Sequence, residues 1–198
     1  MKWNKLILIL LFAGTFCFGV SATGALMQQQ ELSQKLVRLH VIANSDSKAD
    51  QQIKMNVKDA LWQELSEMNW QNKEELIMWF CRNKTEIQDI CKKELEKNNI
   101  KQTVNVLLET ERYDTRTQEG YTLPAGEYLS LKVVLGQGNG KNWWCVLYPN
   151  ILWAGTEPAV QNVFSDDEIS LMKQPEQVQV KLRLLELINF FKISLQDT

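Results

Sequence analysis

The sequence predicts an α+β protein in which helices pack on one face of a mainly antiparallel sheet. Three observations predict this class: an early run with apolar residues at every second position, two long segments with helical spacing, and three more alternating runs in the second half. The expected order is strand, helix, helix, three strands, helix. A net charge of −2 and 23% charged residues give no electrostatic reason to expect nucleic acid as a partner.

Residues 1–25 have the layout of a secretory signal. Lys2 and Lys5 precede an uncharged, mostly apolar run over residues 6–20, and small residues follow with a cleavage site after Ala22. This run is shorter than the roughly 20 residues that a membrane span needs. We therefore expect the chain to be exported.

An uncleaved anchor over residues 6–25 is the alternative, because no charge interrupts this stretch. In either case, membrane contact is expected only through this segment. Residues 26–35 are polar and rich in glutamine, and we expect them to form a stalk. Residues 36–198 contain no internal repeat and no long linker, so a single α+β domain is predicted there.

The first strand is predicted over residues 36–43, where one face is strongly apolar. The polar stretch that follows ends the strand. Ser47 and Asp50 fit an acidic variant of the capping box, which places the start of a helix near residue 48. Apolar residues keep helical spacing from there to about residue 68.

A second helix is expected over residues 73–97, and it contains two of the three cysteines beyond the export segment. Cys81 and Cys91 are separated by about 15 Å along a helix axis, whereas a disulfide needs Cα atoms within about 7 Å. An intramolecular bridge would therefore join Cys145 to one of them. The alternative is three buried thiols that act as small hydrophobic residues.

Three strands are predicted in the second half, over residues 102–112, 126–135 and 142–148. The stretch GQGNGKN, residues 136–142, separates the last two of these strands. A strand, a glycine turn and a strand in succession predict a β-hairpin. The stretch lacks the spacing of a phosphate-binding loop, so no nucleotide is expected there.

The C-terminal part is predicted to be helical. Ser165 and Glu168 fit a capping box at the start of a short helix. Residues 177–184 alternate as a strand does, but Pro175 before them and an apolar run behind them favour a helix. We expect the helix.

The stretch RLHVIANSDS, residues 38–47, contains the only histidine of the chain. His40 and Ser45 are residue types of a catalytic triad, but the strand pattern places His40 opposite the apolar face and leaves Ser45 in the turn. One histidine and scattered cysteines match no zinc spacing, and the acidic residues of the turn lack the glycine of a calcium loop. We expect no catalytic residue, no metal and no cofactor. A hydrolase centred on His40 is the weakest alternative.

The same stretch is better explained as a capped turn between a strand and a helix, with Asn44 in an unusual backbone conformation. Arg38 and His40 would then be polar groups on one sheet face, available to a partner. Trp143 and Trp144 must point to opposite faces of their strand. One of them is expected in the core, and the other is a candidate contact for a protein or a sugar unless both are covered.

Two blocks of sequence carry a family resemblance. LVRLHVIANSDSKADQQIKMNVKDA and the later PAGEYLSLKVVLGQGNGKNWWCVLYPNI resemble the stage II sporulation protein R family, in their order as well as their residues. The resemblance implies a signal made in the forespore of endospore-forming bacteria and exported into the space between the forespore and mother-cell membranes. There it would trigger a membrane-embedded aspartic protease, which processes the mother-cell sigma factor E precursor.

The resemblance implies a protein that acts by contact, without catalytic residues of its own. One departure is that the family pattern has a second cysteine seven residues after Cys145, where this chain has Leu152. A carbohydrate-binding module of the cell wall, using surface tryptophans, is the main alternative function. The candidate partner-binding residues are Arg38, His40, Asn44, Asp46, Asp50, Asn142, Trp143 and Trp144.

Overall fold

The computed structural model describes residues 27–68, 70–118, 120–149 and 163–173. These residues form two compact units. The larger unit runs over residues 34–113 and 127–166, and the smaller one holds residues 27–33, 114–126 and 167–173. The expected export segment, residues 1–25, and the uncertain stretch 177–184 lie outside the described residues. No helix in the described part of the chain is long and apolar enough to cross a membrane.

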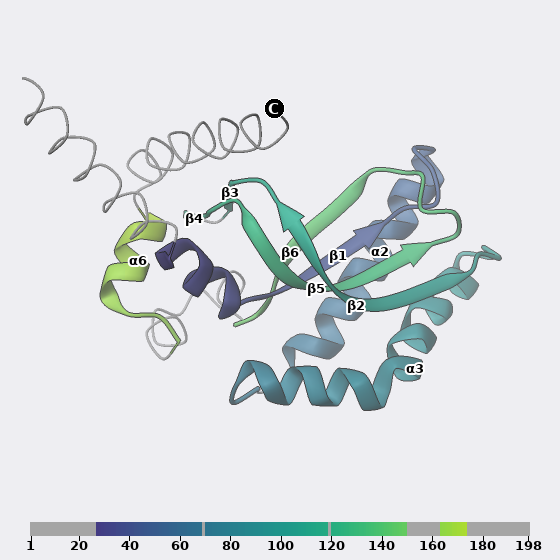
Figure 1. The fold of residues 1–198 in the computed structure, drawn as a ribbon. Coiled ribbons are helices and arrows are strands. Elements are labelled where there is room, and N and C mark those ends of the chain that lie inside the picture. The colour runs from purple at the N-terminus through teal and green to yellow at the C-terminus, as the bar shows by residue number, and fades with distance from the viewer. Residues whose placement is uncertain (1–26, 69, 119, 150–162, 174–198) are drawn as a thin grey trace, which may run out of the picture. The chain divides into compact units, whose positions relative to one another are not determined.

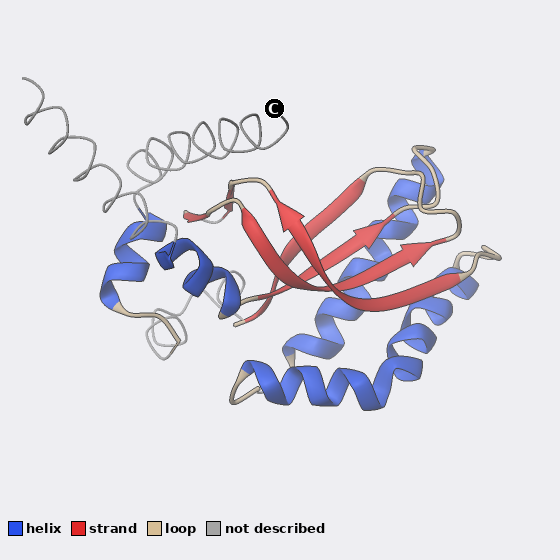
Figure 2. Cartoon of the chain, in the orientation of Figure 1, coloured by secondary structure: helices blue, strands red, loops and turns tan. Residues whose placement is uncertain are grey.

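The larger unit is an α+β sandwich, as predicted (Figure 1). Its elements are β1 (Val37–Ile42), α2 (Lys48–Ser66), α3 (Lys73–Lys97), β2 (Val104–Tyr113), β5 (Gly126–Leu135) and β6 (Asn142–Tyr148). Figure 2 shows the two helices beside each other against the four-stranded sheet. Apolar side chains from both helices and from one face of all four strands form a common core, in which Leu39, Leu61 and Ile87 are fully buried.

The strand order is β2-β5-β1-β6, with β1 parallel to β5 and antiparallel to β6. The predicted hairpin between β5 and β6 is therefore wrong, because β1 lies between these two strands. β1 pairs with β5 on one side and with β6 on the other, and from Val37 to Val41 every residue of this inner strand is buried. The glycine-rich connection thus has to cross the end of β1.

Local sequence signals explain where the helices begin. Ser47 is the N-cap of α2, and its side chain accepts the hydrogen bond of the Asp50 backbone N–H, as predicted. Asn72 caps α3 in the same way through the Glu75 backbone N–H, and α3 has the predicted bounds. Asn83 interrupts the helical backbone of α3 and donates its side-chain N–H to the Trp79 carbonyl at 2.8 Å.

The smaller unit contains the short pair β3 (Arg116–Gln118) and β4 (Tyr121–Leu123), and α6 (Asp166–Lys173) from its second residue onward. The predicted short helix after Ser165 is confirmed, since α6 begins at the next residue. Residues 27–34 are helical, with Leu32 fully buried, inside the stretch expected to be a stalk. The division into signal, stalk and single domain stays a prediction.

Candidate functional site: two polar networks on the central strand

The connection between β5 and β6 packs over the turn that follows β1. Its backbone N–H groups donate to backbone carbonyls at this turn: Asn139 to Asn44 at 3.1 Å and Gly140 to Ala43 at 2.9 Å. We call residues 43–50 together with residues 136–141 the loop junction. It brings together the two sequence blocks that carried the family resemblance, although they lie about ninety residues apart in the chain.

Side chains of the turn complete the loop junction. Asn44 accepts the Gln137 backbone N–H on Oδ1 at 3.0 Å, and its Nδ2 donates to Asp50 Oδ2 at the same distance. Asp46 Oδ1 accepts the Lys141 backbone N–H at 2.7 Å. The backbone of Asn44 does not adopt a positive φ, so that expectation was wrong; Asn99 is the non-glycine residue that does so in the described chain. The contribution of Asn44 is made by its side-chain amide, which hydrogen-bonds to Gln137 of the connection and to Asp50 of α2.

Two glycines make this close packing possible. A Cβ on Gly136 would lie 2.1 Å from Asn44 Oδ1, and its φ of 56° is itself unfavourable for a side chain. A Cβ on Gly140 would lie 2.3 Å from the Ser45 carbonyl oxygen. The glycines therefore serve the contact with the turn rather than a tight hairpin.

The carboxylate of Asp50 stabilises the loop junction as a hydrogen-bond acceptor. It accepts hydrogen bonds from the Ser45 hydroxyl and from Gln102 Nε2, the latter at 2.7 Å, in addition to Asn44. These donors, Ser45 first, lower the pKa of Asp50 although burial opposes them. Lys54, also buried, donates to the Lys141 carbonyl at 3.0 Å, and its pKa is lowered by burial.

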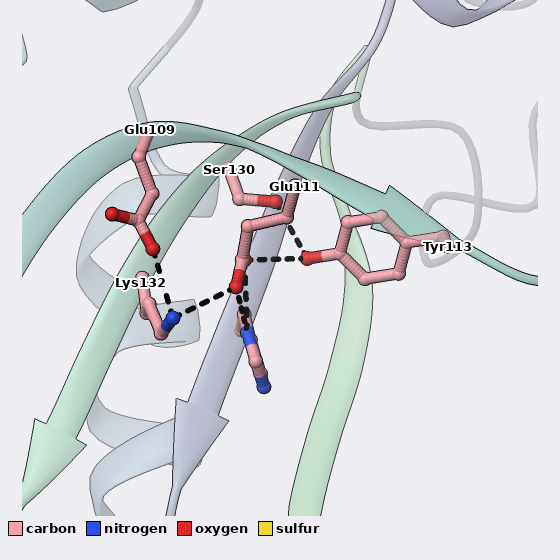
Figure 3. A network of polar contacts seen from close by, with 6 residues as sticks. Glu109, Glu111, Tyr113, Ser130 and Lys132 are labelled. Carbon is pink, nitrogen blue, oxygen red and sulfur yellow. Dashed lines mark hydrogen bonds and ion pairs between the residues drawn. The ribbon is translucent and has the colours of Figure 1, made fainter. Parts of the chain in front are cut away.

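A second network lies on the sheet face opposite the core (Figure 3). We call it the sheet-face network, and it consists of His40, Glu109, Glu111, Tyr113, Ser130 and Lys132. Glu111 is its centre and accepts three donors: His40 Nδ1 at 2.9 Å, Lys132 Nζ at 2.9 Å and the Tyr113 hydroxyl at 3.0 Å. Burial raises the pKa of Glu111, but these three partners together lower it below its usual value.

The network extends to Glu109 and Ser130. Lys132 Nζ also lies 2.8 Å from Glu109 Oε1, so one ammonium group serves two carboxylates. The Tyr113 hydroxyl lies 2.5 Å from Ser130 Oγ. Because the tyrosine proton points to Glu111, the serine hydroxyl is the donor in this pair. These contacts join β1, β2 and β5.

Arg38 and His40 share this face but are not presented at the surface as expected. Their exposed fractions are 2% and 6%. The guanidinium carbon of Arg38 lies 4.0 Å from the centre of the Tyr113 ring and 5.1 Å from that of Tyr128. Arg38 packs against the two tyrosine rings and His40 is hydrogen-bonded to Glu111, so the expectation that both side chains are exposed is wrong.

The two tryptophans point to opposite faces of β6, as predicted. Trp143 packs against the core, with Lys58 Nζ 5.0 Å from the centre of its ring. Trp144 lies on the other face, 5.6 Å from His40 between ring centres, and is partly buried. Neither side chain forms an open platform, and the sugar-binding alternative gains no support from them.

Of the remaining candidate residues, Asp46 and Asn142 are exposed, whereas Asp50 is buried and Asn44 is partly buried. Whether any of the eight candidate residues binds a partner stays a prediction. In the described part of the chain, no cluster of three or more histidine, cysteine or acidic residues could hold a metal ion.

The three cysteines in the described residues are free thiols. Cys91 and Cys145 are fully buried, and burial raises the pKa of each to about 12. Cys81 is exposed on α3, contrary to the expectation of three buried thiols.

Sequence reasoning missed the sheet-face network beyond His40. The signal was nonetheless present in β2, where Glu109, Glu111 and Tyr113 occupy the alternate positions opposite the apolar Val106 and Leu108. Carboxylates at successive positions of one strand face need cationic partners on the neighbouring strand. Lys132 of β5 is that partner, but only the strand order brings the two together.

A family model described as stage II sporulation protein R matches residues 33–157, a range that contains both networks. The chain belongs to this family. Stage II sporulation protein R of Bacillus subtilis (strain 168) is 31% identical over 151 residues, which cover 74% of this chain and 66% of the relative. The chain thus spans slightly less than two thirds of the length of that relative. No solved structure matches the chain.

The two sequence blocks that carried the resemblance to this family form one packed structure at the end of β1. Their hydrogen-bonded groups hold the connection between β5 and β6 over the turn that follows β1.

Proposed function

We propose that this chain is an exported sporulation signal that activates a membrane-embedded aspartic protease by contact with its outer face. The activated protease processes the mother-cell sigma factor E precursor. Family membership carries this proposal. The proposal places the protein in the space between the forespore and mother-cell membranes, where residues 1–25 direct it.

The geometry of the loop junction supports action by contact. Its polar groups bond to one another and so hold an irregular loop in a defined position. A loop held by a rigid scaffold loses little entropy when it binds a partner. The exposed rim consists of Asp46, Ser47, Lys48, Gln137, Asn139 and Lys141 of the junction, together with the adjoining Asn142 at the start of β6. We propose this rim as the surface that meets the protease.

A co-expression experiment in a bacterium that does not sporulate tests the function. The cells would contain the membrane protease, the sigma factor precursor and the full chain, and shortening of the precursor would be followed on a gel. We expect shortening that requires the protease and residues 1–25. A folded and exported chain that leaves the precursor intact would contradict direct activation and favour the carbohydrate-binding alternative.

Charge-reversal variants then test the rim. Lys141→Glu changes an exposed side chain of the junction, while the hydrogen bonds of residue 141 are made by its backbone. Lys93→Glu makes the same change on the exposed face of α3 and is the matched control. We expect Lys141→Glu to reduce precursor shortening at least several-fold without lowering stability, and Lys93→Glu to leave it unchanged. Equal effects of the two variants would exclude the rim as the contact surface.

A further inference from the structure

The sheet-face network determines which ring nitrogen of His40 carries the proton when the imidazole is neutral. The carboxylate of Glu111 is ionised because Lys132, Tyr113 and His40 all donate to it. A carboxylate only accepts, so the proton of the neutral imidazole must lie on Nδ1. The other ring nitrogen, Nε2, then carries a lone pair. It is buried and makes no hydrogen bond of good geometry with the described residues, although the side chain of Asn142 on β6 lies close enough to act on His40 as a hydrogen-bond partner.

Among the described residues, the charges that act on His40 are the carboxylate of Glu111 on β2 and the ammonium group of Lys132 on β5, which lie 2.9 Å from each other. Tyr113 on β2 is the other titratable group against the imidazole, and burial raises its pKa, so it stays neutral. Arg38, Glu109 and Tyr128 contact Tyr113 or Lys132. From β6, His40 meets Trp144 and the side chain of Asn142, neither of which titrates. Glu111 and Lys132 already offset each other, so a proton on His40 would add a further charge at a buried position.

We propose that His40 makes the sheet an acid-sensitive lock. The neutral imidazole joins the central strand β1 to β2 through Glu111. Protonation places a second cation near Lys132 in a buried site, and the folded state of the larger unit is weakened. The lock acts within the fold of this chain and does not depend on the proposed signalling function.

The direction of the effect follows from the position of His40. Burial lowers its pKa below the ordinary value of 6.5, as does the charge of Lys132, although the hydrogen bonds with Glu111 and Asn142 and the charge of Glu111 oppose them. The unfolded chain thus takes up the proton at a higher pH than the folded chain does. Stability is complete above about pH 6.5 and falls as the pH drops from there to the folded pKa. The unfolding equilibrium constant rises about tenfold for each pH unit in this window.

The first test uses the fact that the chain has one histidine. In the full chain, purified without a histidine tag, the imidazole gives a single set of NMR signals that needs no assignment. We expect a titration below pH 6.5 and, near neutral pH, the nitrogen shifts of a neutral ring protonated at Nδ1. A titration at or above 6.5, or a ring protonated at Nε2, would overturn the proposal.

Two variants test whether His40 controls the stability of the sheet. His40→Asn keeps an N–H donor near Glu111 but cannot titrate, so the loss of thermal midpoint between about pH 7.5 and about pH 5.5 should be smaller than in the unchanged chain. Lys132→Met removes one cation from the network, so His40 should titrate at a higher pH than in the unchanged chain, and the acid sensitivity should become smaller.

Acid sensitivity that is the same in the unchanged chain and in His40→Asn would show that other groups cause it and would refute the lock. An unchanged histidine titration in Lys132→Met would refute the charge-balance argument. If either variant does not fold, the NMR titration of the unchanged chain still decides.

Discussion

Gly136 and Gly120 adopt the same left-handed backbone region but have different surroundings. The φ values are 56° and 82°. A Cβ on Gly120 would meet nothing within 4 Å, whereas one on Gly136 would lie 2.1 Å from Asn44 Oδ1. Substituting each glycine by alanine therefore distinguishes two costs. At Gly120 the cost comes from the backbone conformation alone, and at Gly136 it also includes the clash with Asn44.

We expect Gly120→Ala to lower the free energy of unfolding by about 1–2 kcal/mol, the cost of a side chain in the left-handed region. Gly136→Ala should cost about 3 kcal/mol or more, because it also displaces Asn44 and leaves buried hydrogen-bonding groups unsatisfied. Urea unfolding of both variants measures this difference. Equal losses would mean that the contact between Gly136 and Asn44 contributes nothing.

At the scale of elements, the connection between β5 and β6 differs from an ordinary glycine-rich loop. From Gly136 to Lys141 every backbone N–H has an acceptor, including Thr103 for Gly136 and Leu135 for Gly138. We expect slow amide hydrogen exchange throughout residues 136–141, and Asn44→Ala should accelerate exchange at Gln137 first. Exchange at the rate of an unstructured peptide in the unchanged chain would contradict the loop junction.

The helices and strands of the larger unit were predictable because local signals determine them. Ser47 and Asn72 are capping residues, and the period of the apolar residues distinguishes α3 from β5. The strand order was not predictable in this way. A glycine-rich stretch between two strands is compatible with a hairpin and with a crossover, and only the pairing of β1 with both β5 and β6 in the folded sheet decides between them. The face that Arg38 and His40 occupy was predicted correctly, but their burial depends on neighbouring strands and could not be inferred from alternation.

At the scale of the larger unit, the reactivity of the cysteines toward an alkylating reagent shows whether the helices and the sheet unfold together. Cys91 on α3 and Cys145 on β6 belong to the same core, and neither is exposed. With pKa values of about 12, both also lack the thiolate that reacts with alkylating reagents near neutral pH. Cys81, on the exposed side of α3, is not shielded from solvent by burial.

We expect an alkylating reagent to modify Cys81 of the native chain at the rate of a free thiol, with each cysteine followed separately by peptide mass spectrometry. Cys91 and Cys145 should react orders of magnitude more slowly and at a common rate, because only global opening of the shared core exposes either of them. In strong denaturant all three should react alike. Faster labelling of Cys145 than of Cys91 in the native chain would show instead that the edge strand β6 detaches while the helices stay folded. The loop junction, which joins β6 to the end of β1, would then not be strong enough to hold the strand in place.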